Sequence, residues 1–247
     1  MIDTHAHLTS LDDADEAVGR AADAGVTRIL TVGTDVEDCR RALSLSERHE
    51  GVFAILGIHP HEAASATAGD LDNLRDLLGH PKAVAVGETG LDWYRDYAPQ
   101  DDQRRLLAAE LELAAGLGKP VVIHTRAADE DTLLALADFP GTVVLHCFSS
   151  PPLLPTALER DWYVSFAGNA TFPKAVDLRL AASAVPAERI LAETDSPYLA
   201  PQPVRGRRNE PANVVHTLAA LAQARGEDPT ELERQIERNA AQCFALP

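Results

Sequence analysis

Aromatic residues are scarce in this 247-residue chain, at 5% of the sequence, although hydrophobic residues of all kinds make up 45%. The core must therefore be built from many aliphatic contacts rather than from a few large rings, which suits an α/β architecture. A chain of this length and apolar content can bury one large core. We therefore expect a single domain over residues 1–247.

Basic residues are also scarce in this chain relative to acidic ones. The chain has 22 basic residues against 38 acidic ones, and its formal net charge is −16. Such a surface does not attract a long nucleic acid or an anionic membrane through its overall field. We therefore expect no membrane association, and any polyanionic substrate has to be bound locally.

Cysteines and long hydrophobic runs are rare as well. Cys39, Cys147 and Cys243 are odd in number and scattered, which argues against a disulfide framework and a cysteine-based zinc site. No run of about 18 apolar residues occurs, and no basic segment followed by an apolar stretch opens the sequence. We expect a cytoplasmic protein without an obligate protein partner.

Short apolar runs alternate with longer helical patterns along the chain. The predicted strands are Ile2–His5, Thr27–Val32, Val52–Leu56, Ala83–Glu88, Val121–His124, Thr142–His146, Tyr163–Phe166 and Ile190–Glu193. The predicted helices are Asp12–Ala24, Val36–His49, Asp70–Leu78, Gln100–Leu117, Asp129–Phe139, Pro151–Arg160, Lys174–Ala184, Ala212–Ala224 and Pro229–Phe244. This alternation requires a parallel sheet with right-handed crossovers, and eight units favour a (β/α)8 TIM-type barrel. An open doubly wound sheet is the alternative, but a G-x-G-x-x-G turn after the first strand is missing.

The first predicted strand runs into His5-Ala6-His7. Residues two apart on an extended strand point to the same face, so both imidazoles can reach one metal ion. This spacing alone is equally typical of two ordinary histidines. Other residues of ligand type, however, also stand at or just past the ends of predicted strands: Glu88, His124, His146 and Asp195. Because the C-terminal strand ends of a barrel form its active site, these side chains would share one centre.

Such a set of side chains predicts one or two divalent cations. Four neutral imidazoles carry no charge, whereas Glu88 and Asp195 supply two negative charges, and a bridging position between two ions is natural for Glu88. Nitrogen-rich ligation favours Zn²⁺, Mn²⁺ or Co²⁺ over Mg²⁺ on affinity, although availability in the cell can reverse that preference. Mg²⁺, Mn²⁺ and Zn²⁺ are therefore all candidates for the bound metal.

Several motifs follow one another along nearly the whole chain: MIDTHAHL, GIHPHE, VGETGLDWY, PVVIHTR, LHCFS and ETDSPYLAP. An RG-x-x-N piece follows them, formed by Arg205, Gly206 and Asn209. In order and in strand-end placement these motifs resemble the TatD-type metal-dependent deoxyribonucleases of the amidohydrolase superfamily.

The resemblance implies a role for each candidate ligand. His5, His7 and Asp195 would bind a first metal and His124 and His146 a second, with Glu88 shared between the two. Asp195 and Glu88 would be the catalytic carboxylates, and Asp195 would also take a proton from the attacking water.

One position departs from the family pattern. The family's usual HCFSG is His146-Cys147-Phe148-Ser149-Ser150 here, so a Cβ stands where glycine is normal. This puts in doubt the local backbone after Ser149, but not metal binding by His146.

Four further residues are predicted to contact the substrate. His59 follows the third strand and could bind a phosphate. Arg126 and Arg205 carry guanidiniums that match phosphate geometry. Trp93 could stack on a terminal base, although packing over the barrel mouth is an equal alternative.

The sequence therefore predicts a metal-dependent hydrolase, with DNA as its partner. The first hypothesis is hydrolysis of phosphodiesters by metal-activated water at single-stranded DNA ends, and the resemblance implies a 3′-to-5′ exonuclease. A small-molecule amidohydrolase, esterase or lactonase could use the same metals. A metal-binding scaffold without turnover is the third alternative, and its function would survive Asp195→Asn.

Overall fold

The strand order defines the fold class. The computed structural model describes residues 1–95 and 97–247. Strands β1 to β8 follow one another in sequence order, as in a (β/α)8 barrel, whereas the order would reverse at a switch point in an open doubly wound sheet. The predicted barrel is therefore confirmed. In the described part of the chain, no helix has the length and apolar character that a membrane span requires.

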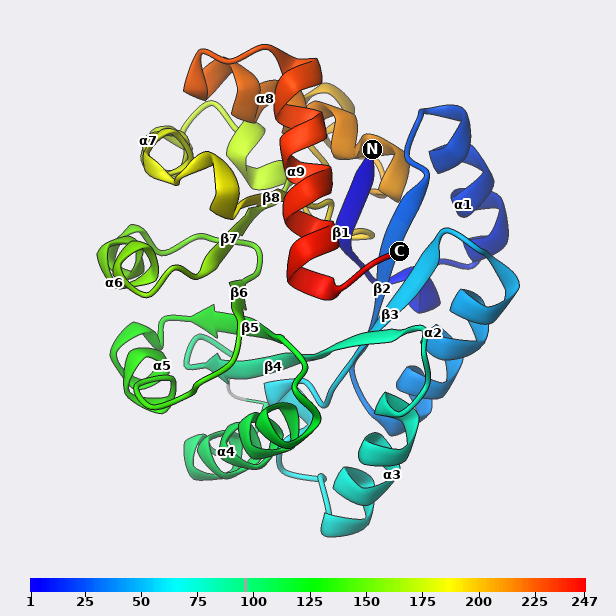
Figure 1. Cartoon of the computed structure of the whole chain (residues 1–247), viewed down its shortest axis with the longest axis vertical. Helices are drawn as coiled ribbons and strands as arrows, with labels where there is room; N and C mark the ends of the chain where they lie inside the picture. Colours follow the sequence, from blue (N-terminus) through cyan, green and yellow to red (C-terminus); the bar gives the residue numbers. More distant parts are fainter. Residues whose placement is uncertain (96) are drawn as a thin grey trace. The chain divides into compact units, whose positions relative to one another are not determined.

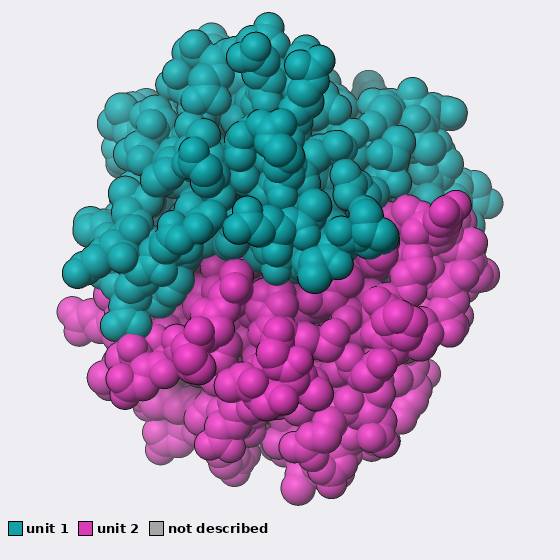
Figure 2. Space-filling view, viewed as in Figure 1, with its two compact units in different colours: residues 1–31, 146–247 teal, residues 32–145 magenta. Residues whose placement is uncertain are grey.

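Each predicted strand and helix has a counterpart in the structure, with its ends shifted by a few residues in many cases. The strands are β1 (Ile2–Ala6), β2 (Arg28–Gly33), β3 (Val52–Leu56), β4 (Ala83–Asp92), β5 (Val121–Arg126), β6 (Val143–Leu145), β7 (Tyr163–Phe166) and β8 (Ile190–Ala192). The α-helices are α1 (Ala14–Asp23), α2 (Val36–Arg48), α3 (Ala68–Leu78), α4 (Gln100–Leu117), α5 (Asp129–Ala135), α6 (Leu154–Glu159), α7 (Val176–Ala184), α8 (Val214–Arg225) and α9 (Pro229–Phe244). The chain divides into two compact units, unit 1 with residues 1–31 and 146–247 and unit 2 with residues 32–145 (Figure 2).

Unit 1 contains both ends of the chain. Strand β1 pairs in parallel with β2, and β7 pairs in parallel with β8. Beyond the named strands, Ala6 forms a parallel bridge with Ser196, so the segments that follow β1 and β8 run side by side. Helix α9 packs against β8 and β1 (Figure 1). Among the largest side chains buried completely in the protein, Phe166 of β7 is accompanied by leucines and isoleucines, as the aliphatic composition predicts.

Unit 2 contains β3 to β6, with α2 to α5 on the outside of these strands (Figure 1). Strand β4 is longer than predicted and continues past Glu88 to Asp92, and its pairing with β5 extends to Asp92 and Arg126. The reason is Gly90, whose φ is 145°. A Cβ at this position would overlap the carbonyl oxygen of His124, so only glycine lets the two strands approach this closely.

Helices α5 and α6 are each four residues shorter than predicted. Helix α5 ends at Ala135 rather than Phe139. A 3₁₀ turn over Pro151–Leu153 replaces the first turn predicted for α6. Prolines 151, 152 and 155 lack the backbone N–H that a regular helix interior needs, which explains the short α6.

The fully buried carboxyl group of Glu110 connects α4 to the segment after β3 and to β4. Its Oε1 accepts a hydrogen bond from the amide of Ile58 at 2.8 Å, and its Oε2 lies 2.5 Å from Oγ1 of Thr89. Burial raises the pKa of Glu110 to about 8, although both hydrogen bonds favour the charged form. Ile58 precedes His59 and Thr89 follows Glu88, so this contact positions the backbone at two candidate site residues.

The raised pKa of Glu110 predicts a pH dependence of stability. Between pH 4.5, its ordinary pKa, and about pH 8, the unfolded chain releases a proton that the folded protein retains, so stability falls as pH rises. Glu110→Gln imitates the protonated side chain and should remove this contribution. The free energy of unfolding, measured by urea denaturation from pH 5 to pH 8, should then fall less steeply than in the wild type. Parallel curves for the two proteins would show that Glu110 is ionised in the folded state.

Candidate functional site

Three predicted ligands in unit 1 lie together. His5 belongs to β1, His146 follows β6, and Asp195 follows β8. Each of the three offers one ligand atom, and these atoms lie within 4.8 Å of one another. The rings of His5 and His146 are stacked with their centroids 3.9 Å apart. His7 joins this group, since its Nε2 lies 3.4 Å from Nε2 of His5.

Asp195 occupies an unusual backbone conformation with φ 54°, and its amide donates to the carbonyl of His5 at 3.0 Å. Its Oδ1 lies 3.5 Å from Nε2 of His7 and 4.0 Å from Nε2 of His5. Burial alone would raise the pKa of Asp195, but the hydrogen bond with His7 and the charges of the neighbouring imidazoles hold that pKa below its ordinary value. Asp195 is therefore held in its ionised form, which is the form that a metal ligand needs.

Two buried polar side chains support the turn that carries Asp195. Asp3 of β1 accepts hydrogen bonds from the amide and the hydroxyl of Thr194, at 2.9 and 2.5 Å. Asn209 donates through Nδ2 to the carbonyls of Thr194 and Tyr198, at 3.0 and 2.6 Å. The asparagine of the RG-x-x-N piece thus has a positioning role.

Glu193 is a site residue that the sequence analysis did not single out. Its Oε1 lies 2.9 Å from Nδ1 of His146 and accepts from the amide of Cys147 at 2.9 Å, while its other oxygen accepts from the hydroxyl of Ser165. A carboxylate behind an imidazole fixes the proton on the nitrogen that faces it, so Nε2 of His146 is left to bind a metal. Its place two residues before Asp195, in the ETD of the last motif, was the available signal.

In unit 2, Glu88 and His124 lie next to each other. Oε1 of Glu88 is 2.7 Å from Nδ1 of His124, and Glu88 is buried. Nε2 of His124 is 3.2 Å from Oδ2 of Asp92, another buried carboxylate that the sequence analysis missed. Because Asp92 follows Glu88 by four residues on one strand, both side chains point to the same face of β4. Placing the strand end at Glu88 hid this relation.

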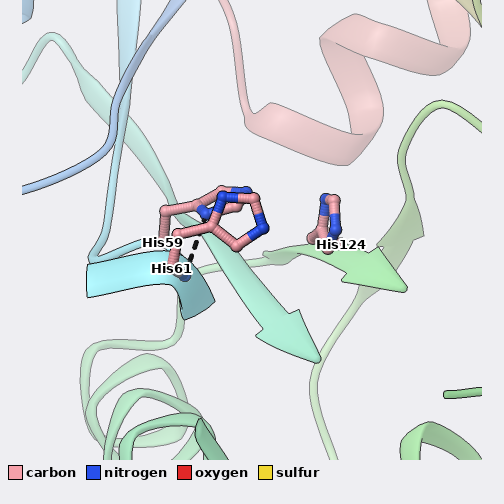
Figure 3. A group of neighbouring side chains, drawn as sticks. All are labelled: His59, His61 and His124. Atoms are coloured by element: carbon pink, nitrogen blue, oxygen red, sulfur yellow. Dashed lines mark hydrogen bonds between the residues drawn. The ribbon is translucent and has the colours of Figure 1, made fainter. Parts of the chain in front are cut away.

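His59 and His61 stand on the turn after β3, beside His124 of β5 (Figure 3). Ligand atoms of these three histidines also lie within 4.8 Å of one another. The amide of His61 donates to Nδ1 of His59 at 3.1 Å, and Nε2 of His61 lies 2.9 Å from Oδ2 of Asp92. Hydrogen bonds to His124, the amide of Arg95 and His61 outweigh burial and hold the pKa of Asp92 well below its usual range.

The protonation of His59 follows from its contacts. Burial lowers its pKa to about 4, despite the opposite effect of Glu88. The ring is therefore neutral near pH 7, and since Nδ1 accepts a hydrogen bond, the proton is on Nε2. This Nε2 lies 3.4 Å from Oε1 of Glu88. In unit 2, the predicted phosphate-binding histidine thus faces a candidate metal ligand.

The other predicted substrate contacts have different surroundings. The indole of Trp93 donates to Asp131 at 2.9 Å and lies below the guanidinium of Arg104, 5.0 Å from the ring centroid. Arg126 is exposed and lies over the ring of Tyr94. Arg205 is exposed in unit 1 and lies over the ring of Phe172 at 4.3 Å. Of these three side chains, Trp93 is the one held against the protein.

The departure from the family pattern at Ser150 is accommodated without strain. Ser150 has φ −121° and ψ 83°, a conformation that any L-residue can adopt. Cys147 instead adopts a positive φ of 45°. Serine therefore fits the local backbone, and the amide of Cys147 still reaches Glu193.

The donor sets fit divalent metal ions. Ligand atoms about 2 Å from a Zn²⁺ ion lie on the order of 3–4 Å from one another, and the ligand atoms of His5, His146 and Asp195 lie within 4.8 Å. Two imidazoles and an ionised carboxylate suit Zn²⁺ or Mn²⁺, and His146 has the supporting carboxylate typical of metal sites. A (β/α)8 barrel with such donors at its strand ends has the architecture of a metal-dependent hydrolase.

Comparison with known proteins identifies the family. The family model described as TatD related DNase matches residues 2–245, so the chain belongs to this family. A TatD protein of Mycobacterium tuberculosis, named an uncharacterized metal-dependent hydrolase, is 39% identical, and the match covers 100% of this chain and 98% of that protein. The 3′-5′ ssDNA/RNA exonuclease TatD of Salmonella typhimurium is 35% identical over 100% of this chain and 99% of that protein. The crystal structure of YjjV, a TatD homologue of Escherichia coli, has a TM-score of 0.94 and 30% identity, covering 100% of this chain and 98% of that one.

These findings confirm the predicted family and the predicted class, a metal-dependent hydrolase. They do not assign the site residues one by one, so the metal ligands remain predictions that rest on the geometry above.

The contact between Glu193 and His146 can be tested by metal binding. Glu193→Gln keeps the shape of the side chain but removes the charge that orients His146, so the affinity for Zn²⁺ or Mn²⁺ should fall about 10- to 100-fold. Titration calorimetry on protein stripped of metal measures this affinity, and the melting temperature of the stripped variant controls for folding. An unchanged affinity would mean that His146 is not a metal ligand oriented by Glu193.

Proposed function

We propose that the chain is a 3′-to-5′ exonuclease that hydrolyses single-stranded DNA from its end. The group of His5, His146 and Asp195 carries this proposal, because it combines two buried nitrogen donors with an ionised carboxylate in a chain of the TatD related DNase family. The names of relatives such as the Salmonella typhimurium and Cronobacter sakazakii exonucleases support the substrate and the polarity. Those names include RNA, which is therefore a second substrate to test.

The proposed metal ligands are His5, His7, His146 and Asp195 in unit 1, and Glu88 and His124 in unit 2. They would hold one or two divalent ions, with Mg²⁺, Mn²⁺ and Zn²⁺ as the candidates. When bound, such ions polarise phosphoryl oxygens and lower the pKa of water.

The residues of the chain itself supply the remaining steps. Asp195 has a lowered pKa and is ionised near pH 7, so it can accept the proton of the attacking water. Glu88, the second proposed catalytic carboxylate, is oriented by the protonated Nε2 of His59 and by His124. The exposed guanidiniums of Arg126 and Arg205 are proposed to bind phosphates of the strand.

Two substitutions test this function. Glu88→Gln and Asp195→Asn remove charge with little change of shape, and each should reduce cleavage of a 3′-open single-stranded oligonucleotide in Mn²⁺ or Mg²⁺ by at least about 100-fold. Gel analysis of 5′-labelled and 3′-labelled oligonucleotides measures the rate and the polarity. The melting temperatures of both variants control for folding.

A substrate panel separates the alternatives. An RNA of the same sequence, simple esters and lactones should be assayed beside the oligonucleotide. If wild-type protein loaded with metal hydrolyses an ester or lactone and leaves the oligonucleotides intact, the small-molecule hydrolase is correct. If both variants keep full nuclease activity, the proposed role of these carboxylates is wrong.

We also propose that residues 1–247 fold as one domain in the cytoplasm. The family match over residues 2–245 supports a single unit of folding. Unit 1 is assembled from two separate stretches of sequence, so it cannot form until unit 2 has been synthesised. Thermal unfolding followed by circular dichroism and by calorimetry should give a single transition, with equal van't Hoff and calorimetric enthalpies. Two resolved transitions would assign the two units to separate folding domains.

A further inference from the structure

A cluster of tyrosines and arginines surrounds the end of strands β4 and β5 in unit 2. Tyr94, Arg95 and Tyr97 follow β4, and Arg126 ends β5. We call these four residues the arginine–tyrosine platform. Tyr94 is 63% exposed and Tyr97 is 62% exposed, and they are two of the chain's four tyrosines. Because aromatic residues are scarce in this protein, two exposed rings so close together need a physical explanation.

The platform has a defined geometry. The guanidinium carbon of Arg126 lies 3.9 Å from the ring centroid of Tyr94, and that of Arg95 lies 5.5 Å from the same ring and 6.0 Å from that of Tyr97. Tyr94 remains mostly exposed despite these contacts, so ring surface is left for another planar group. The ring of Tyr97 lies edge-on to His61, with centroids 4.7 Å apart, so the platform adjoins the histidines of Figure 3.

The charges of the platform are unusual for this protein. Elsewhere many arginines are paired with carboxylates, as Arg41 is with Asp38 and Arg104 with Asp131. Within residues 1–95 and 97–247, by contrast, Arg95 and Arg126 contact tyrosine rings and make no ion pair. Among the described residues of a chain with a net charge of −16, these two guanidiniums thus stand outside ion pairs and beside two exposed rings. This combination suits a ligand that carries negative charges and flat rings together.

Trp93, the predicted stacking residue, is held against the protein more than Tyr94 is. Its indole N–H is bound to Asp131, and Arg104 covers the ring. Its amide donates to the carbonyl of Arg126 at 2.9 Å, which connects the strand end of Arg126 to the loop that carries Tyr94. Trp93 therefore holds the platform in place.

We propose that the platform binds unpaired nucleotides of a single strand, with bases stacked on Tyr94 and Tyr97 and phosphates bound by Arg95 and Arg126. This inference rests on the proposed nuclease function and adds to it a site for the strand outside the candidate metal ligands. Stacking on exposed rings does not depend on base identity, so the platform selects unpaired strands without selecting sequence. A duplex cannot use it, because its bases are already stacked on one another.

Binding measurements separate the platform from catalysis. Fluorescence anisotropy with a labelled 3′-open single strand, in the Asp195→Asn background, gives Kd without turnover. Tyr94→Ala should raise Kd by roughly 5- to 150-fold, the effect expected for loss of one stacked base. Tyr94→Phe keeps the ring and should bind as the parent does. Leu134→Ala, which removes an apolar side chain that is 75% exposed, is the matched control.

The salt dependence tests the arginines independently. For single strands, each phosphate contact contributes about 0.7 to the slope of log Kd against log salt concentration. Arg126→Ala should reduce this slope by about that amount, whereas Arg126→Lys and Tyr94→Ala should retain it. Arg234→Ala removes one positive charge from an exposed position on α9 and should leave the slope unchanged.

Clear outcomes overturn the proposal. The platform does not bind nucleotides if the Kd of Tyr94→Ala stays within twofold of the parent's value. The same conclusion follows if this substitution raises the Kd for a blunt duplex as much as the Kd for the single strand. It also follows if Arg126→Ala keeps the full slope of log Kd against log salt concentration. This result is distinct from failure of the proposed function. If the proposed function itself is wrong, the wild-type protein will leave single strands uncut, whatever the platform variants do.

Discussion

The close approach of β4 and β5 at Gly90 is the constraint on which unit 2 depends. Because no side chain separates the backbone of Gly90 from the carbonyl of His124, the two strands stay paired up to Asp92 and Arg126. Glu88 and Asp92 then face the same histidine from one strand. The same pairing places the tyrosines after β4 beside the guanidinium at the end of β5. The absence of a Cβ at Gly90 thus allows Glu88 and Asp92 to lie beside His124, and it also allows Tyr94 to lie beside Arg126.

In unit 1, buried polar side chains rather than a glycine hold the candidate ligands in place. Asp195 has a left-handed backbone conformation that is costly for a residue with a side chain. Asp3 and Asn209 hold that turn through hydrogen bonds to Thr194 on both sides. Glu193 orients His146 through its hydrogen bond with Nδ1 of that ring. The candidate ligands Asp195 and His146 are therefore held by buried side chains, which water does not reach.

Much of this arrangement could be predicted from the sequence, because it follows from periodicity. The βα alternation predicts the barrel, and strand ends of a barrel are where ligand residues gather, so His5, His146 and Asp195 were within reach. Glu193 also ends its predicted strand, but its role could not be predicted, since the histidine it contacts is 47 residues away and no local pattern encodes that pairing. Asp92 was missed because Gly90 looks like a strand breaker. Trp93 and Tyr94 are both aromatic, and the contacts of Trp93 with Asp131 on α5 and Arg104 on α4, which the sequence does not reveal, distinguish the two rings.

The loop after β4 is attached at more than one point. Asp92 accepts hydrogen bonds from the amides of Tyr94 and Arg95, both through Oδ1, while its other oxygen faces His61 and His124. A loop restrained in this way loses little conformational freedom when it meets a ligand, so less of the contact energy is spent on ordering it. The carboxylate of Asp92 also connects the backbone after β4 with the imidazoles of His61 and His124. Any displacement of Asp92 would therefore change its contacts with the two backbone amides and with the two imidazoles at once.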